Sequence, residues 1–225
     1  MPPALSFDER RRVEGILIDA FRSFPATLQG AYRSLYGSGS CGVSSMLTDR
    51  EAAELEAAGI LWSPADLWYL SSGCARQWPD ARGLWISEKD DCFVRVNEED
   101  HICVGAIATN DGIQGAARRA EEVVCALEYG MQKAGYAFAR GDSLGFFTSC
   151  PSNVGTGVRP SVVVRLPLLS ARPDFAAACS RLRLAGKQSA EGGQWTLTTI
   201  DAGGRSVAQA VAGFCRSVRR VVEWE

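Results

Sequence analysis

The sequence predicts an α+β fold in which an antiparallel β-sheet is flanked by helices. Segments with apolar residues at helical spacing alternate with short apolar or alternating runs of strand length. Short reversals join the strand-like runs, and none of them carries the Gly-rich fingerprint of a parallel βαβ unit. The 225 residues are enough to bury a full core as one large domain.

Two helices are predicted in the N-terminal quarter. Residues 8–22 place apolar side chains on one stripe, and Ser6 or Asp8 is available as the N-cap. Residues 48–58 begin with Thr-Asp-Arg-Glu, the pattern of a capping box. Between these helices, residues 37–45 are rich in Gly and Ser and predict an exposed loop.

The middle of the chain predicts a strand pair and a long helix. An apolar and aromatic cluster at residues 62–70 indicates a corner of the core. Residues 92–96 and 102–108 have strand length and should pair as neighbours, with the acidic residues 98–100 at their junction. Residues 115–132 carry apolar side chains at helical spacing and predict a helix that packs on the sheet.

A Gly-containing loop at residues 150–159 joins residues 144–149 and 161–166, which we interpret as two buried strands. Its small residues allow backbone N–H groups to converge on an anion. Two close glycines more often mark only a turn, so this pattern alone is weak.

The C-terminal part predicts two further helices and a strand. A helix begins at Pro173 and runs to about Leu184, and residues 194–200 indicate a strand. Ser206 is the expected N-cap of a final amphipathic helix.

Composition excludes several classes of function. The formal charge of −2 gives no basic footprint for nucleic acid. The eight cysteines form no Cys-x-x-Cys pair and the chain has a single histidine, which argues against zinc and favours free thiols in a reducing compartment. No apolar run reaches the roughly 18 to 20 residues that span a bilayer, and no secretory leader is recognisable, so we expect an intracellular protein, cytoplasmic or mitochondrial.

Three motifs together resemble those of the phosphagen kinases, the creatine and arginine kinases that move a phosphoryl group between ATP and a guanidine. The first is Cys150-Pro-Ser-Asn-Val-Gly-Thr-Gly-Val-Arg159, preceded by Gly-Phe-Phe-Thr-Ser. The others are Asn97-Glu-Glu-Asp-His101 and Trp78-Pro-Asp-Ala-Arg-Gly83. The resemblance covers nearly the whole chain and implies a single catalytic domain over residues 1–225, without the family's small helical N-terminal domain.

The resemblance also implies roles for particular residues. Glu99 would hold and activate the guanidinium, and Cys150 would contact it as a thiolate. Arg159 would grip nucleotide phosphate, and Glu98 would lie near the water shell of Mg²⁺. Further candidates for binding Mg-ATP or Mg-ADP are Asn153, Gly155, Thr156 and His101.

Each of these residues also has a purely structural interpretation, and the residues themselves fix no cofactor. Glu99 fits a solvated turn carboxylate, Cys150 a buried thiol and Arg159 a surface ion pair.

The chain departs from the family pattern where that pattern places positive charge. Cys103 stands at a position where the family has an arginine. Residues 185–193 replace a longer loop that supplies another arginine and a second carboxylate, and Lys187 is only a point charge in its place. The family's upstream Ser-x-Arg-x-Arg segment has no counterpart in this sequence.

These departures lead to three hypotheses about function. The first is a catalytically inactive domain that serves as an accessory or scaffold subunit, with other protein subunits of a larger assembly as partners. The second is a module that binds nucleotide without transferring phosphate. The third is an active ATP:guanidino phosphotransferase.

Overall fold

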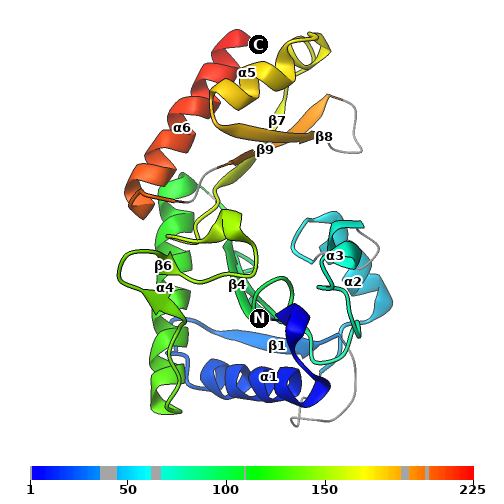
Figure 1. Cartoon of the computed structure of the whole chain (residues 1–225), viewed down its shortest axis with the longest axis vertical. Helices are drawn as coiled ribbons and strands as arrows, with labels where there is room; N and C mark the ends of the chain where they lie inside the picture. The colour runs from blue at the N-terminus through cyan, green and yellow to red at the C-terminus, as the bar shows by residue number, and fades with distance from the viewer. Residues whose placement is uncertain (1, 36–44, 62–66, 109, 189–192, 201–202) are drawn as a thin grey trace. The chain divides into compact units, whose positions relative to one another are not determined.

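The computed structural model describes residues 2–35, 45–61, 67–108, 110–188, 193–200 and 203–225. Internal contacts divide the chain into two compact units, Met1–Phe138 and Ala139–Glu225, each of which is described by itself (Figure 1). Within the described residues, no helix is long and apolar enough to cross a membrane.

Unit 1 is built on a four-stranded antiparallel sheet in the order β1-β2-β3-β4. Short reversals connect β2 to β3 and β3 to β4, so neighbours in the sequence are neighbours in the sheet. The strands are β1 (Gly30–Ser34), β2 (Gly83–Ser87), β3 (Cys92–Val96) and β4 (Ile102–Ala106). The helical elements are η1 (Pro2–Ala4), α1 (Phe7–Arg22), α2 (Asp49–Ala57), α3 (Leu67–Ser71) and α4 (Gly112–Lys133).

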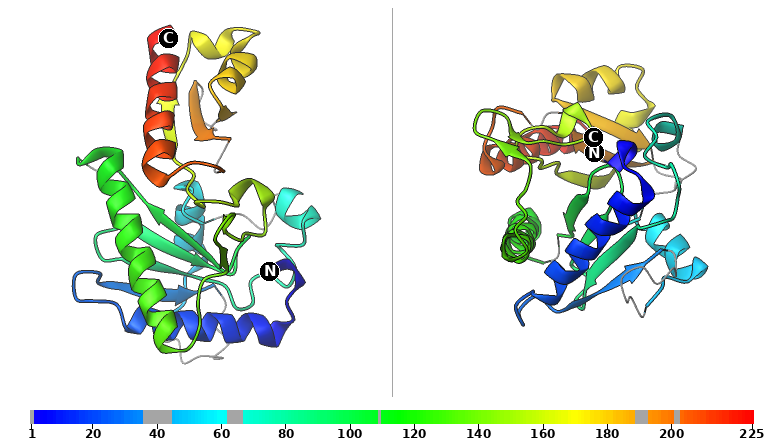
Figure 2. Two further views of the ribbon diagram at one scale, coloured as in Figure 1. Left: turned by 60° about the vertical axis from the view of Figure 1, so that its left-hand side comes forward. Right: turned by 60° about the horizontal axis from the view of Figure 1, so that its bottom comes forward.

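Helices α1 and α4 cover one face of this sheet (Figure 2). Strand alternation sends Trp85 of β2 and Val94 of β3 to this face, where both are almost fully buried. The core they share with the helices comprises Leu17, Ala20, Phe21, Trp85, Cys92, Val94, Val96, Val123, Leu127 and Met131. The amphipathic stripes of both helices therefore bury their apolar sides against the sheet, as the sequence predicted.

The opposite face of the sheet carries a smaller apolar cluster of Leu47, Leu84 and Phe93. Gly105 lies directly across the β3–β4 ladder from Phe93. A Cβ atom at this glycine would collide with the Phe93 ring, so glycine is required there. Arg95 projects from the same side of β3 as Phe93, and its guanidinium lies 5.4 Å from the centroid of the Phe93 ring.

Unit 2 contains a three-stranded antiparallel sheet in the order β7-β9-β8, together with the two-stranded β5-β6 hairpin. Helices α5 and α6 cover the three-stranded sheet (Figure 1). The elements are β5 (Arg140–Gly141), β6 (Gly145–Phe146), η2 (Pro151–Asn153), β7 (Ser161–Arg165), η3 (Leu169–Ala171), α5 (Phe175–Arg181), β8 (Leu184–Gln188), β9 (Gln194–Thr199) and α6 (Val207–Trp224). Phe175 packs edge-to-face on Trp195 at 4.7 Å, and the Glu225 carboxylate accepts hydrogen bonds from the backbone of Leu168 and Leu169.

The α+β class with antiparallel sheets and flanking helices is confirmed. Ser6, Thr48 and Ser206 each begin a helix with a complete capping box, in which the side chain three residues later bonds back to the cap. Residues 92–96 and the start of 102–108 pair as neighbouring antiparallel strands, as predicted.

Other local predictions were wrong. The segment 144–149 contains only the two-residue strand β6, and residues 161–165 alternate between exposed and half-buried before the buried Leu166, so neither segment is a buried strand. Leu67 is 81% exposed and Leu70 55% exposed, which contradicts a core corner at these positions. Strands β1, β2 and β8 were missed. Residues 36–44, which hold most of the expected loop 37–45, lie outside the described residues.

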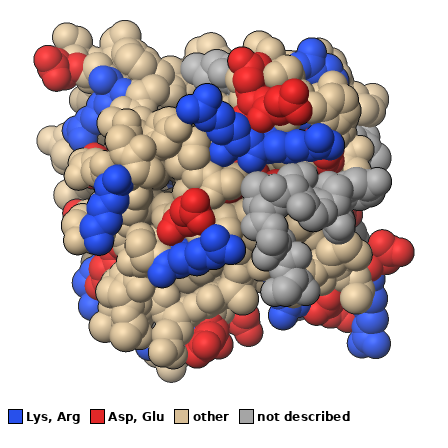
Figure 3. All heavy atoms as spheres, turned by 90° about the horizontal axis from the view of Figure 1, so that it is seen from below, with Lys and Arg blue, Asp and Glu red and all other residues tan. Residues whose placement is uncertain are grey.

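Basic and acidic side chains lie next to one another on the face drawn in Figure 3. No broad patch of one sign covers that face, in line with a formal charge of −2 for the whole chain.

Candidate functional site

The acidic turn, residues 97–101 between β3 and β4, is organised by Asn97. This residue has a φ of +55°, a left-handed conformation that asparagine tolerates better than most residues. Its backbone N–H donates to the carbonyl of His101 at 3.0 Å and closes the turn. Its side-chain amide is fully buried and donates to the carbonyls of Arg10 and Ala81, at 3.1 and 2.8 Å. Asn97 therefore joins the turn to α1 and to the segment before β2.

His101 completes the same turn from its other end. Because the Asn97 amide nitrogen already donates to two carbonyls, its oxygen Oδ1 is the acceptor for Nδ1–H of His101 at 3.0 Å. Burial lowers the pKa of His101, which favours the neutral ring. In this structure the predicted nucleotide-binding histidine is a partner of Asn97.

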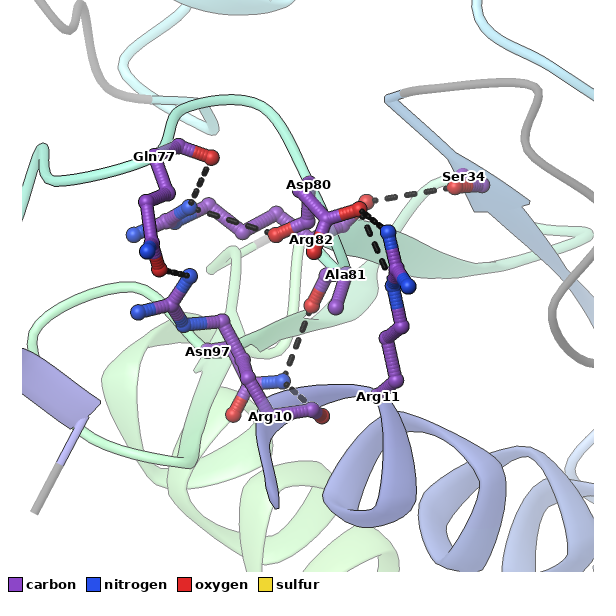
Figure 4. Close-up of polar contacts among 8 residues, drawn as sticks. All are labelled: Arg10, Arg11, Ser34, Gln77, Asp80, Ala81, Arg82 and Asn97. Carbon is purple, nitrogen blue, oxygen red and sulfur yellow. Dashed lines mark hydrogen bonds and ion pairs between the residues drawn. The ribbon is translucent and has the colours of Figure 1, made fainter. Parts of the chain in front are cut away.

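The segment Trp78–Gly83 contacts the acidic turn through the Ala81 carbonyl, which accepts from the Asn97 amide (Figure 4). Arg82 is 1% exposed, and its guanidinium donates to backbone carbonyls, the shortest bond being 2.7 Å to Cys74. It also lies over the Trp78 ring at 5.2 Å. Burial lowers the pKa of Arg82 to about 10, which leaves it charged at neutral pH.

Two residues of α1 bind side chains of residues 77–80 (Figure 4). Arg11 forms an ion pair with Asp80 at 2.9 Å. Arg10 is fully buried and donates to the side chain of Gln77 at 3.0 Å. The third sequence motif thus contributes a buried polar network that holds the acidic turn in place.

Glu98 is enclosed within unit 1. Its side chain is 4% exposed, and Oε1 accepts from Nη1 of Arg95 at 2.7 Å and from the Tyr69 hydroxyl at 3.4 Å. Burial raises the pKa of Glu98 to about 7 against the lowering effect of Arg95. The Glu98 carboxylate is therefore held by Arg95 and Tyr69, both of unit 1.

Arg95 lies directly opposite Cys103 in the β3–β4 register. Directly paired residues of an antiparallel ladder project from the same face, with Cβ atoms roughly 4.5 to 5.5 Å apart. Burial raises the pKa of the Cys103 thiol, so the thiol stays neutral. The arginine that the family pattern places at residue 103 is therefore matched here by an arginine one strand away.

Glu99 and Asp100 follow Glu98 at the tip of the acidic turn, and both are half-buried. Each has interactions within the described structure. Glu99 is less enclosed than Glu98, as a substrate-binding carboxylate must be.

The acidic turn does not fit a divalent metal ion. Mg²⁺ takes oxygen ligands and keeps several waters, so a carboxylate that serves it must present an open lone pair to solvent. Glu98 is nearly enclosed, and a guanidinium already occupies one of its oxygens. Among the described residues, no group of three or more His, Cys, Asp or Glu side chains could hold a metal.

The loop of residues 150–159 in unit 2, here called the Cys150 loop, folds back on β6. Phe146 and Gly155 exchange two backbone hydrogen bonds, at 2.8 and 3.3 Å. Gly155 and Gly157 have φ values of +124° and +68°, conformations that require glycine. The two glycines of the motif thus shape a compact loop whose residues are exposed or half-buried.

Three side chains of the Cys150 loop have defined partners. The Cys150 Sγ lies 2.9 Å from the Ser152 hydroxyl. Arg159 is exposed and donates from Nη1 to the Asn153 amide oxygen at 3.0 Å. The Thr156 hydroxyl accepts from the backbone of Val158 at 3.4 Å. An oriented, exposed guanidinium beside a glycine loop is suited to binding an anion.

The structure gathers the predicted residues into two groups. Glu98, Glu99 and His101 share the acidic turn of unit 1, and Cys150, Asn153, Gly155, Thr156 and Arg159 share the Cys150 loop of unit 2. Sequence reasoning missed Arg95 and Tyr69, which contact Glu98. The signal for Arg95 was a lone arginine within the apolar run Cys92–Val96. Lys187 lies exposed in β8, opposite Thr196.

Comparisons with known proteins agree on one class of protein. The family model "ATP:guanido phosphotransferase, C-terminal catalytic domain" matches residues 17–225. The chain is 33% identical over its full length to the M-type creatine kinases of Gallus gallus and Homo sapiens, and it spans 58% of the length of each.

Solved structures give the same result. Lombricine kinase superposes with a TM-score of 0.84 at 26% identity, covering 99% of this chain and 61% of that one. The duplicated taurocyamine kinase from Schistosoma mansoni, with bound transition state analog components, gives 0.85 at 26% identity, covering 99% and 30%. Fold and motifs are those of a phosphagen kinase catalytic domain. The chain belongs to the ATP:guanido phosphotransferase family.

Proposed function

We propose that this chain is a phosphagen-kinase-like domain that does not transfer phosphate and serves as an accessory or scaffold subunit, with other proteins as partners. The observation that carries the proposal is the enclosure of Glu98 by Arg95 and Tyr69. Phosphoryl transfer requires a metal ion and fixed cations around the phosphates, and the carboxylate that the family pattern places near the metal is here enclosed and paired with a guanidinium.

Magnitudes support inactivity. Removing one group that stabilises transition-state charge typically costs about 10²- to 10³-fold in rate, and an arginine on a transferring phosphoryl group is worth about 10³- to 10⁵-fold. The Arg95–Glu98 pair withdraws a carboxylate, and residues 185–193 lack the arginine and the second carboxylate that the longer loop of the family pattern supplies. Even with strong non-additivity, the remaining rate would be negligible.

The scaffold role is supported by the parts of the fold that the departures from the family pattern leave unchanged. Unit 1 keeps a continuous apolar core on α1, α4 and the sheet. The buried polar network of Arg10, Arg82 and Asn97 joins α1, the segment before β2 and the acidic turn. A domain that retains its framework while its charged groups change is suited to binding protein partners through its surface.

Phosphotransfer remains the competing function, and nucleotide binding without transfer is its weaker form. One feature of the loop favours both: Asn153 orients the exposed guanidinium of Arg159. The relatives named above are kinases, and their guanidine substrates are natural acceptors to test.

The deciding experiment is a phosphotransfer assay with Mg-ATP and five acceptors: creatine, lombricine, taurocyamine, free arginine and an arginine-rich protein. Phosphorus NMR would detect the phosphoguanidine, with a creatine kinase as the positive control. We expect no product above the level of the Glu99→Gln variant. Turnover with any acceptor that Glu99→Gln abolishes would overturn the proposal.

A further inference from the structure

We propose that unit 2 has a docking site for an acidic segment of a partner protein, a stretch rich in Asp and Glu, in a groove between α5, α6 and the ends of β8 and β9. The inference rests on the proposed scaffold function, because it names the chemistry of a partner. It concerns unit 2 alone and involves neither the acidic turn nor the Cys150 loop.

The groove, here called the arginine groove, consists of two adjoining hollows of about 250 and 510 Å³. The hollows share Leu182, Arg216 and Ser217, so they form one continuous surface. Glu223 is the only carboxylate among the lining residues that the structure describes. An elongated groove of one charge is suited to an extended acidic segment. Its exposed arginines are Arg181, Arg183, Arg205, Arg216, Arg219 and Arg220.

The backbone that forms the arginine groove is held by contacts within unit 2. The Ser217 hydroxyl of α6 donates to the carbonyl of Leu182 at 2.9 Å, which joins α6 to the turn after α5. Arg183 in this turn has a φ of +58°, a left-handed conformation that is uncommon for residues other than glycine. Its carbonyl accepts from the backbone N–H of Ile200 at 3.0 Å. The groove is therefore preformed, and a ligand need not order its backbone.

Two guanidinium groups converge on Gly213 of α6. A Cβ atom at this glycine would lie 3.6 Å from Nη1 of Arg205 and 3.9 Å from Nη2 of Arg216. Unlike Arg11 and Arg172, neither of these arginines forms an ion pair with a carboxylate that the structure describes. Two like charges at one spot repel each other, and a carboxylate between them would be attracted by both. The space beside Gly213 is thus the expected anchor for an Asp or Glu side chain of the partner.

An acidic polypeptide is favoured over nucleic acid as the occupant. The whole chain has a formal charge of −2, so its field outside the arginine groove does not attract a long polyanion. A protein segment can also place apolar side chains on the half-buried Leu182 in the floor of the groove.

Fluorescence anisotropy with a labelled peptide of alternating Glu and Gly tests the site, and a Gln-Gly peptide of equal length is the uncharged control. We expect only the Glu peptide to bind. Arg205→Gln with Arg216→Gln should weaken binding by about tenfold or more, as for loss of charge-assisted hydrogen bonds. The matched control, Arg50→Gln with Arg118→Gln, removes the same charge from exposed positions of α2 and α4 and should change the affinity by less than about twofold.

Equal weakening in the two double variants would overturn the inference, because binding would then follow net charge alone. No binding of the Glu peptide up to millimolar concentration would also overturn it. Neither result bears on phosphoryl transfer, which the phosphotransfer assay decides separately.

An isosteric pair of substitutions tests the anchor itself. Gly213→Glu places a carboxylate beside the two guanidinium groups, and Gly213→Gln places an amide of the same shape there. Both should raise the unfolding temperature, because glycine is a poor helix former. We expect Gly213→Glu to weaken binding of the Glu peptide by about tenfold or more relative to Gly213→Gln. Equal affinities of these two variants would overturn the anchor, and tighter binding of inorganic phosphate or of a single-stranded oligonucleotide than of the peptide would overturn the assignment to a protein segment.

Discussion

The acidic turn and the Cys150 loop carry two of the three family motifs, yet they are built in opposite ways. In the turn, Asn97 is fully buried, Glu98 is nearly so, and every hydrogen bond described above is made within unit 1. In the loop, Ser152, Gly157 and Arg159 are exposed, and Asn153 is half-buried. The turn is held by buried side-chain hydrogen bonds, and the loop by backbone bonds, two of them with Phe146, and by side-chain contacts among exposed or half-buried residues.

This difference shows that motif residues can have different physical roles. A buried amide that satisfies two backbone carbonyls contributes mainly to stability, because removing it leaves those carbonyls unpaired. An exposed guanidinium contributes little to stability and stays available to a ligand. Substitutions in the turn should therefore change the free energy of unfolding, and substitutions in the loop should change binding.

The largest expected effect compares two asparagines. Asn97→Ala should lower the free energy of unfolding by about 3 kcal/mol, because it leaves two buried carbonyls unpaired and places alanine at a positive φ. Asn153→Ala in the Cys150 loop should cost no more than about 1 kcal/mol. Urea unfolding followed by tryptophan fluorescence measures both. Similar losses for the two variants would contradict the contrast between turn and loop.

Removing the cation beside Glu98 should have the next largest effect. Arg95→Met leaves a buried carboxyl without its counter-ion and should cost about 2 to 4 kcal/mol at pH 8. Adding Glu98→Gln should restore most of that loss, because the charge is then gone. A double-mutant cycle in urea measures the coupling energy. Additive losses would mean that the two side chains do not interact.

The pH dependence of stability should report on Glu98. Its pKa is about 7 in the folded protein against a usual value near 4.5, so the folded state binds this proton more tightly. The contribution of Glu98 to stability is thus present below about pH 4.5 and is lost as pH rises through 7. A rise from 4.5 to about 7 corresponds to a loss on the order of 3 kcal/mol at about 1.36 kcal/mol per pKa unit. Glu98→Gln should flatten the profile of unfolding free energy between pH 5 and 8. An unchanged profile would show that Glu98 is not the group responsible.

The smallest change in stability is expected for Arg159→Ala. Its hydrogen bond to Asn153 lies at an exposed position, so the free energy of unfolding should change by less than about 0.5 kcal/mol. Binding of ADP, measured by calorimetry, should nevertheless be lost. Wild-type affinity in the variant would remove Arg159 from the nucleotide site.

Local patterns were enough to predict the framework around the turn. The capping boxes at Ser6, Thr48 and Ser206 involve residues three apart, and the pairing of β3 with β4 follows from two apolar runs joined by a short acidic reversal. Strand β8 was not predicted because Leu-Ala-Gly-Lys-Gln contains no β-branched or aromatic residue. The strand is stabilised by its pairing with β9, which local sequence does not reveal.

The enclosure of Glu98 could not be predicted in the same way. It depends on the residue-by-residue register that sets Arg95 opposite Cys103, and on Tyr69, which comes from a helix 29 residues earlier in the chain. Sequence reasoning counted the missing arginine at residue 103 as a lost charge. A one-residue shift in register would have sent Arg95 to the other face of the sheet, so only the structure shows the exchange.

Native-state hydrogen exchange compares the turn and the loop within one molecule and is the most direct test of this account. The N–H of Asn97, bonded to the His101 carbonyl, should exchange only through global unfolding of unit 1, while the amides of residues 156–158 should exchange by local opening. Adding ADP should slow exchange in the loop. Exchange at Asn97 as fast as in the loop would contradict the claim that the acidic turn is a structural element and the Cys150 loop a binding element.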